Sequence, residues 1–358
     1  MKDLIISYDL DQYALGHLTS AVQFGFITGT FLFALLSIAD RFMATRVFFI
    51  CAIMGALFNL GLVWEQNSYS ILIVFRYLTG FFLAGIYPVG MKIASDHFDK
   101  GLGKSLGFLV GALVLGTAFP HFLKSVATDV SWELVIYFIS GLALTGGLLI
   151  LLFVPKGPYS SKGSEFRFSA FLSVFKNKTF RSAAFGYFGH MWELYAFWAF
   201  VPVMLSTYSI MYPSSSINVS VWSFIIISVG GLSCVLGGYL SEYLGTKKVA
   251  SVALGLSGLC CVACPFMFQL NEPSFFLAFL VLWGMAVIAD SPLFSSMVAK
   301  NAPLKYKGTA LTIVNCFGFA ITILSIQLIT YALALTPNVA IYMLLALGPV
   351  IGLYKLLK

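Results

Sequence analysis

Five ionisable side chains stand inside the apolar stretches of this sequence, and their types and spacing suggest proton or ion chemistry. They are Arg76, Lys92, His190, Glu193 and Asp290. A charge at the centre of a membrane-spanning helix costs about 2.5 to 3.5 kcal/mol on insertion scales, so such residues usually pair with one another or face a cavity. His190 and Glu193 are three positions apart, which puts them on one face of a helix. A proton can pass between an imidazole and a carboxyl group in that arrangement.

Each of these groups has a chemical role and a structural alternative. We predict Glu193 as the best candidate for a proton-binding or substrate-binding carboxylate and Asp290 as the second candidate. Asp290 can alternatively stabilise a kinked helix. Arg76 presents a planar fork suited to carboxylates or nitrate-like oxyanions, or it forms an ion pair that locks helices. Lys92 can extend to the interface, and His190 can be a hydrogen-bonded packing residue. Three aromatic residues are candidates to wall a solute site: Trp192, Tyr195 and Tyr87.

The elements that must position these residues are membrane-spanning helices. Of 358 residues, 59% are hydrophobic and 10% charged, and the mean hydropathy is +0.93. Soluble domains are about 45 to 50% apolar and about 25% charged. A spanning helix needs about 20 apolar residues, and eleven stretches meet that need: 14–39, 46–64, 71–94, 102–123, 132–154, 182–208, 219–240, 249–268, 274–298, 309–333 and 339–357. The sequence predicts an all-α integral membrane protein with eleven visible transmembrane helices and no soluble catalytic domain.

The basic residues divide unequally between the two sides of these helices. Of the 21 Lys and Arg residues, 17 fall in loops on one side, Lys2 and Lys124 fall on the other, and two lie within a helix. Short cytoplasmic loops are enriched in Lys and Arg, so we expect a cytoplasmic C-terminus and an N-terminus of this chain outside. We expect a multi-pass protein of the bacterial inner membrane. The same bias explains the net charge of +7 without a nucleic-acid partner.

Landmarks recur along the chain at an offset of 202 to 204 residues. The recurring pairs are Gly80 and Pro88 with Gly284 and Pro292, and Asp40 and Arg46 with Glu242 and Lys248. Transporter folds are commonly built from repeats. The duplication predicts a five-helix bundle in 1–154, a cytoplasmic linker in 155–181 and a six-helix bundle in 182–358. Because the partner of a second repeat that begins near Arg181 would begin before Met1, we expect the first helix of the first repeat to be missing.

The loop GGYLSEYLGTKK resembles the Gly-x-x-x-Asp-Arg-x-Gly-x-Lys/Arg-Lys/Arg loop of the major facilitator superfamily. The matching residues are Gly238, Glu242, Gly245, Lys247 and Lys248, with Glu in place of Asp. The N-terminal copy keeps Asp40, Arg41 and Arg46. It has Leu36 and Met43 where glycines are expected, while Arg76 and Gly80 look like the fourth-helix pattern Arg-x-x-x-Gly. The strings GYFGHMWELYAFWAFVPVML and WGMAVIADSPLFSSMVAKNAP look like a bacterial subgroup loosely related to nitrate and cyanate porters.

This resemblance covers the whole chain less the family's first helix, and it implies a two-bundle fold with alternating access. In the family, the acid of the loop caps a neighbouring helix N-terminus, and its cations form a cytoplasmic charge relay that closes the outward-facing state. By resemblance, Asp96 can join the relay by pairing with Arg41 or Arg46. The helices that carry the five ionisable residues would be the fourth, seventh and tenth of the family, which line its central cavity.

These residues together predict a secondary active transporter and not an enzyme. We expect a small polar or anionic solute to move by alternating access, coupled to a proton on Glu193, Asp290 or His190. Two alternatives stay open: a degenerate, non-transporting sensor or remnant, and an intramembrane enzyme, whose aspartyl type would need a second buried Asp besides Asp290. The expected partners are the solute, protons and the lipid bilayer, with the chain as a monomer. We expect no cofactor and no metal site, because the six cysteines lie in apolar runs as reduced packing residues.

Overall fold

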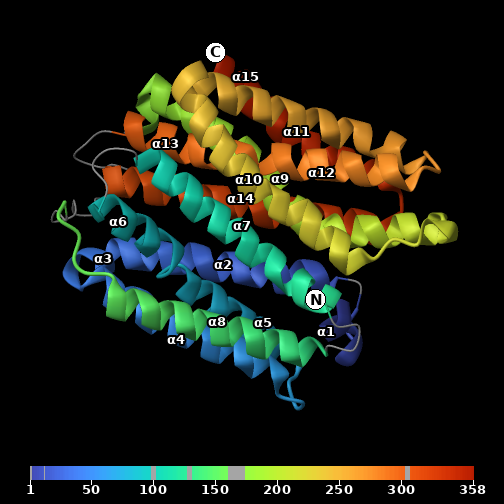
Figure 1. The fold of residues 1–358 in the computed structure, drawn as a ribbon, viewed down its shortest axis with the longest axis horizontal. Helices are drawn as coiled ribbons and strands as arrows, with labels where there is room; N and C mark the ends of the chain where they lie inside the picture. Colours follow the sequence, from blue (N-terminus) through green and yellow to red (C-terminus); the bar gives the residue numbers. More distant parts are fainter. Residues whose placement is uncertain (1, 12, 98–101, 127–130, 160–173, 303–306) are drawn as a thin grey trace. The chain divides into compact units, whose positions relative to one another are not determined.

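Helices form nearly all of the described chain, because a backbone in lipid must satisfy its own hydrogen bonds. The computed structural model describes residues 2–11, 13–97, 102–126, 131–159, 174–302 and 307–358, and within them it contains no strand (Figure 1). The earlier helices are α1 (Lys2–Ser7), α2 (Ala14–Leu35), α3 (Ile38–Arg41), α4 (Ala44–Leu60), α5 (Tyr69–Leu83), α6 (Tyr87–His97), α7 (Leu102–Val126) and α8 (Trp132–Phe153). The later helices are α9 (Lys178–Met211), α10 (Val219–Leu244), α11 (Thr246–Phe268), α12 (Pro273–Ala289), α13 (Ser291–Asn301), α14 (Lys307–Leu335) and α15 (Leu347–Leu357). Short 3-10 helices are η1 (Gly61–Val63), η3 (Val174–Lys176), η4 (Pro213–Ser215) and η6 (Val339–Ala346).

Eleven helical segments of the described residues are long and apolar enough to cross a membrane, which confirms the eleven predicted spans. Four segments consist of two consecutive helices, namely α4 with η1, α5 with α6, α12 with α13, and η6 with α15. Polar side chains fix several helix starts by accepting from a backbone N–H of the first turn. Ser68 caps α5, Ser131 caps α8 and Asn218 caps α10.

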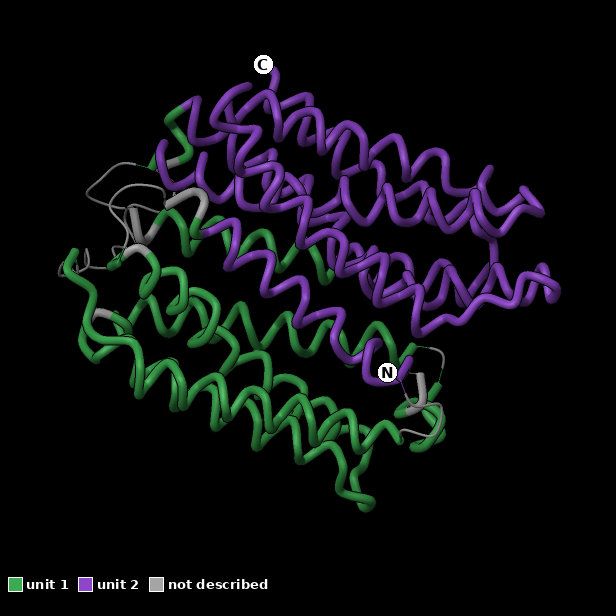
Figure 2. Tube along the Cα trace, in the orientation of Figure 1, with its two compact units in different colours: residues 1–105, 131–177, 302–323 green, residues 106–130, 178–301, 324–358 purple. Residues whose placement is uncertain are grey.

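The described helices gather into two compact units, and each unit includes segments from distant parts of the chain (Figure 2). The first unit holds residues 1–105, 131–177 and 302–323, and the second holds 106–130, 178–301 and 324–358. Within the second unit, Gly111 of α7 lies against the backbone of Gly231 on α10. Within the first, the ring centroids of Phe26 on α2 and Phe319 on α14 are 4.3 Å apart. The units therefore follow helix contacts and not chain order, and the two bundles in 1–154 and 182–358 stay a prediction.

Each unit contains one pair of helices that packs in the same register as a pair in the other unit. In the first unit, a Cβ added at Gly80 of α5 would meet the carbonyl of Val22 on α2. In the second, a Cβ at Gly284 of α12 would meet the carbonyl of Ile226 on α10. Both residues of the second contact follow those of the first by 204 positions. Two more contacts keep this offset: Gly29 with Phe81 and Ser233 with Met285, then Phe33 with Gly85 and Gly237 with Ala289. The repeated Gly landmark in the sequence therefore marks a repeated helix contact.

The repeated prolines mark a second shared feature, a break in one spanning segment of each unit. Pro88 is the second residue of α6, and Pro292 is the second residue of α13. A proline has no N–H to give to the preceding turn and its ring crowds that turn, so a helix ends before it and a new one begins. The second break leaves Asp290 between α12 and α13, as the residue that ends α12.

The two inter-helix loops with the charged motif have different backbones. Gly245, between α10 and α11, has φ +89° and ψ 135°, which only glycine adopts readily. Met43, in the N-terminal copy, has φ −60° and ψ 121°, which any residue adopts. There the chain takes its positive φ at Ser37 instead, at 52°. The methionine in place of the motif's glycine is tolerated because the turn has moved along the chain.

Replacing Gly245 with alanine will destabilise the protein by about 1 to 3 kcal/mol, the usual cost of a side chain in a strained backbone region. The measurement is the thermal unfolding midpoint of the detergent-purified protein. Gly238→Ala is the matched control, because that glycine lies inside α10 and an added Cβ would meet nothing within 4 Å. An equal response of the two variants would contradict a special conformation at Gly245.

Candidate functional site

The side chain of Glu193 is held inside the second unit by donors from two other helices. It extends from α9 and is 0% exposed. Its Oε1 accepts from the indole Nε1 of Trp283 at 2.6 Å and from the thiol of Cys261 at 3.3 Å. Its Oε2 accepts from the hydroxyl of Ser257 at 2.8 Å. Because no lysine or arginine of the described chain pairs with Glu193, neutral donors alone stabilise its charged form.

His190 and Asp290 form a second buried polar pair, one helical turn from Glu193 along α9. Both side chains are 0% exposed, and Nδ1 of His190 lies 2.7 Å from Oδ1 of Asp290. This short contact is an ion pair when the His190 imidazole is protonated. Oδ2 of Asp290 and Nε2 of His190 are buried and have no hydrogen-bond partner among the described residues. Such atoms are favourable positions for a proton or for a polar atom of a solute.

Three of the predicted site residues are thus brought together by the fold of the second unit. His190 and Glu193 share one face of α9, as their spacing predicts, and Asp290 reaches His190 from the break between α12 and α13. The sequence interpretation missed the donors to Glu193, which are Ser257, Cys261 and Trp283. A serine and a tryptophan in the middle of apolar stretches were the available signals. Cys261 is a free, buried cysteine, as predicted, and it also donates to the Glu193 carboxylate.

The other predicted residues have different surroundings. Trp192 donates from Nε1 to the carbonyl of Leu344 at 3.0 Å, which ties α9 to η6. Tyr195 is half-buried on α9, and its ring centroid is 5.3 Å from that of Trp198. The residues of the set that belong to the first unit are half-buried: Arg76, Tyr87 and Lys92. A solute contact for these residues stays a prediction.

Comparison with known proteins identifies the family of this chain. The family model described as Major Facilitator Superfamily matches residues 2–352, which is nearly the whole chain. The chain belongs to the major facilitator superfamily. The eleven spans and the glycine-rich loop at Gly245 are the features by which the sequence resembles this superfamily, and the family assignment made from them is confirmed.

Two similar proteins describe how far the relationship extends within the superfamily. An uncharacterized transporter of Buchnera aphidicola subsp. Baizongia pistaciae is 32% identical over 94 residues, which are 26% of this chain and 23% of that protein. This chain therefore matches about a quarter of the relative's length. The crystal structure of the E. coli fucose:proton symporter FucP aligns with a TM-score of 0.67, covering 99% of this chain and 93% of that chain at 14% identity. An identity this low shows a shared fold, and the nitrate and cyanate porter subgroup stays a prediction.

The charged loop of the superfamily forms few ion pairs in this member. Asp96 pairs with Lys92, whose Nζ lies 3.2 Å from Oδ2 one turn back along α6. This partner is a neighbour four positions away on the same helix, and the pairing of Asp96 with Arg41 or Arg46 stays a prediction. Residues of the second loop are exposed and form no ion pair with any residue that the structure describes: Glu242, Lys247 and Lys248. The side chain of Asp40 lies outside the described residues, and the relay itself stays a prediction.

Replacing Trp283 with phenylalanine will lower the thermal unfolding midpoint, because it removes the Nε1 donor from a buried carboxylate. A hydrogen bond to a charged group contributes about 1.5 to 3 kcal/mol. In the double variant with Glu193→Gln, the cost of the Trp283 change will be smaller, because a neutral amide needs less from the indole. Trp222→Phe, on α10 and without a hydrogen bond to Glu193, is the matched control. Additive effects of the Trp283 and Glu193 changes would contradict the proposed interaction.

Proposed function

We propose that this chain is a secondary active transporter that moves a small polar or anionic solute by alternating access, coupled to a proton carried by Glu193, Asp290 or His190. The observation that supports it best is the Glu193 carboxyl, which is 0% exposed inside a spanning segment and accepts from three donors on two other helices. A group that can gain or lose a charge at this position links protonation to the packing of α9, α11 and α12.

The surroundings of Glu193 act on its two protonation states in opposite directions. Apolar burial disfavours the carboxylate, while donors from Trp283, Ser257 and Cys261 favour it. A change in how α11 and α12 approach α9 would alter the donors and therefore the preferred protonation state. Alternating access requires such a link between helix packing and proton binding.

Support for a proton as the coupling ion and for the solute class comes from separate observations. The solved protein with a similar fold is named a fucose:proton symporter, so its name states that it couples its solute to a proton. In this chain, the unpartnered Oδ2 of Asp290 and Nε2 of His190 can exchange hydrogen bonds with a polar solute. The half-buried guanidinium of Arg76 on α5 suits an oxyanion or carboxylate. We place the protein in a bacterial inner membrane with a cytoplasmic C-terminus, from the Lys and Arg bias.

The proposal is tested with the full chain in proteoliposomes that contain a pH-sensitive dye. A panel of amino acids, organic acids, inorganic oxyanions and fucose is added outside, one at a time, without a preset pH gradient. We expect one class to drive protons across the membrane, and a protonophore to abolish the signal. Solute movement without proton flux would contradict the coupling. Failure of every solute either to bind or to move would favour a non-transporting member of the superfamily.

A further inference from the structure

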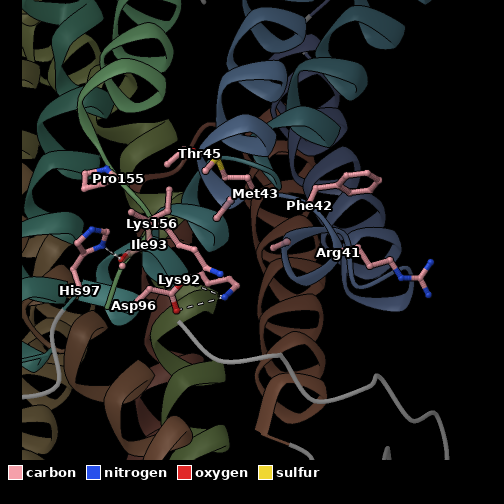
Figure 3. A pocket seen from close by; sticks show the side chains of 13 residues that line it. Arg41, Phe42, Met43, Thr45, Lys92, Ile93, Asp96, His97, Pro155 and Lys156 are labelled. Carbon is pink, nitrogen blue, oxygen red and sulfur yellow. Dashed lines mark hydrogen bonds and ion pairs between the residues drawn. The ribbon is translucent and has the colours of Figure 1, made fainter. Parts of the chain in front are cut away.

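A second polar site lies in the first unit, at the ends of four helices, and includes neither Glu193 nor Asp290. A cavity of about 430 Å³ is lined by the turn between α3 and α4, by the last turns of α6, and by residues 155–157 after α8 (Figure 3). Cavities of about 300 to 1,000 Å³ are typical of small-ligand sites. One wall is fixed by the backbone, because the N–H of Tyr159 donates to the carbonyl of Asp96 at 2.9 Å.

The charged residues that line this cavity are mainly basic. Among the described residues of the lining Asp96 is the one acidic residue, and Lys92 already pairs with it at 3.2 Å. Lys156 is exposed and has no ion-pair partner in the described chain. Arg41 also belongs to the lining, but its side chain extends away from the other labelled residues in Figure 3. Asp96 is therefore neutralised, and the ammonium of Lys156 gives the cavity a positive charge.

Polar atoms without partners also face this cavity. Thr45 is 4% exposed, and its hydroxyl forms no hydrogen bond with the residues that the structure describes. His97 uses Nδ1 to donate to the carbonyl of Ile93 at 2.8 Å, and its Nε2 is buried without a partner in the described chain. A buried polar atom without a partner, as Nε2 of His97 is, costs free energy that a bound polar group would recover.

The start of α4 adds backbone donors to the same place. Met43 precedes the helix and gives no side-chain cap. The N–H groups of Arg46 and Val47 both donate to the carbonyl of Met43, at 2.9 and 3.1 Å. Within the described part of the chain, no backbone carbonyl accepts from the amides of Ala44 and Thr45, which line the cavity. A helix N-terminus carries partial positive charge, and its first amides bind anions.

We propose that this cavity binds a phosphate group, either of an anionic lipid headgroup or of a soluble phosphate compound. The Thr45 hydroxyl, the first amides of α4 and the ammonium groups of Lys156 and Lys92 offer donors from three chain segments, which suits a tetrahedral oxyanion better than a planar carboxylate. Bound phosphate would tie α4 to α6 and to residues 155–157. The inference does not depend on transport.

The test measures binding to the purified full chain in detergent. Inorganic phosphate is titrated against sodium chloride at matched ionic strength, and the thermal unfolding midpoint is recorded. In parallel, native mass spectrometry measures retention of phosphatidylglycerol against phosphatidylcholine. We expect saturable stabilisation by phosphate, selective retention of phosphatidylglycerol, or both. Phosphate alone would identify a soluble ligand, and selective lipid retention alone would identify a headgroup.

Three variants decide whether the cavity is responsible. Thr45→Val keeps the side-chain shape and removes the hydroxyl, and Lys156→Gln removes the free ammonium. Each will weaken the response about tenfold, as expected for a lost hydrogen bond to a charged ligand. Lys248→Gln, at an exposed lysine of the second loop that does not line the cavity, will respond as the wild type. The same response in all three variants, or no saturable response to either probe in the wild type, would overturn the proposal.

Discussion

Replacing Glu193 with glutamine will abolish solute-driven proton movement in proteoliposomes. Glutamine has nearly the same shape and can still accept from Trp283 with its one amide oxygen, while its NH2 group faces the Ser257 hydroxyl, but it cannot gain or lose a proton. A neutral amide carries no buried charge for the donors to offset. The thermal unfolding midpoint of the variant should therefore be near that of the wild type. The measurement compares dye-reported proton entry with solute-for-solute exchange, which requires no net proton transfer. We expect the proton entry to fall to the level of empty liposomes while exchange persists.

Two controls separate this role from a general effect of removing a carboxylate. Glu272→Gln changes an exposed acid at the start of α12 and should leave proton entry unchanged. Asp290→Asn tests the second candidate and should impair coupling without removing the donors to Glu193. Unchanged, pH-dependent uptake by Glu193→Gln would eliminate Glu193 as the coupling residue and would direct attention to Asp290 and His190.

The second large effect is expected at the repeated helix contact, where Gly284→Ala and Gly80→Ala will each destabilise the protein. An added Cβ at either glycine would strike a backbone carbonyl of the neighbouring helix, that of Ile226 or Val22. A backbone group cannot rotate away, so the two helices must separate. Overpacking of this kind costs about 1 to 3 kcal/mol, and sometimes more. Thermal unfolding midpoints in detergent provide the measurement.

The control for this contact predicts the opposite sign. Gly116 lies in α7, and an added Cβ there would meet nothing within 4 Å. Because alanine is favoured over glycine in a helix by about 1 kcal/mol, Gly116→Ala should be neutral or stabilising. Gly284 also directly follows Trp283, so separating α10 from α12 should disturb the donor to Glu193 and reduce coupling. Gly80→Ala, in the other unit, should leave the donors to Glu193 in place. Equal stability of the three alanine variants would show that the close contacts are not required.

The sequence alone determines the number of spans in this protein, because each span needs its own apolar stretch whatever it packs against. It also determines that His190 and Glu193 share a face, since three positions make nearly one turn of a helix. The repeated Gly and Pro landmarks are visible in the same way, because both repeats keep the same local backbone requirements. Family membership follows from these local features and from the charged loop.

The tertiary structure alone decides what surrounds the ionisable residues. The donors to Glu193 are 64, 68 and 90 positions away from it, so their approach depends on which faces of three helices meet. Apolar periodicity does not reveal those faces, because a helix in lipid is apolar on its outer side as well as on its packed side. For the same reason, the sequence could not show that Asp96 turns to Lys92, or that Thr45 faces a cavity without a partner. Local patterns therefore fix the helices, and only their packing fixes the chemistry between them.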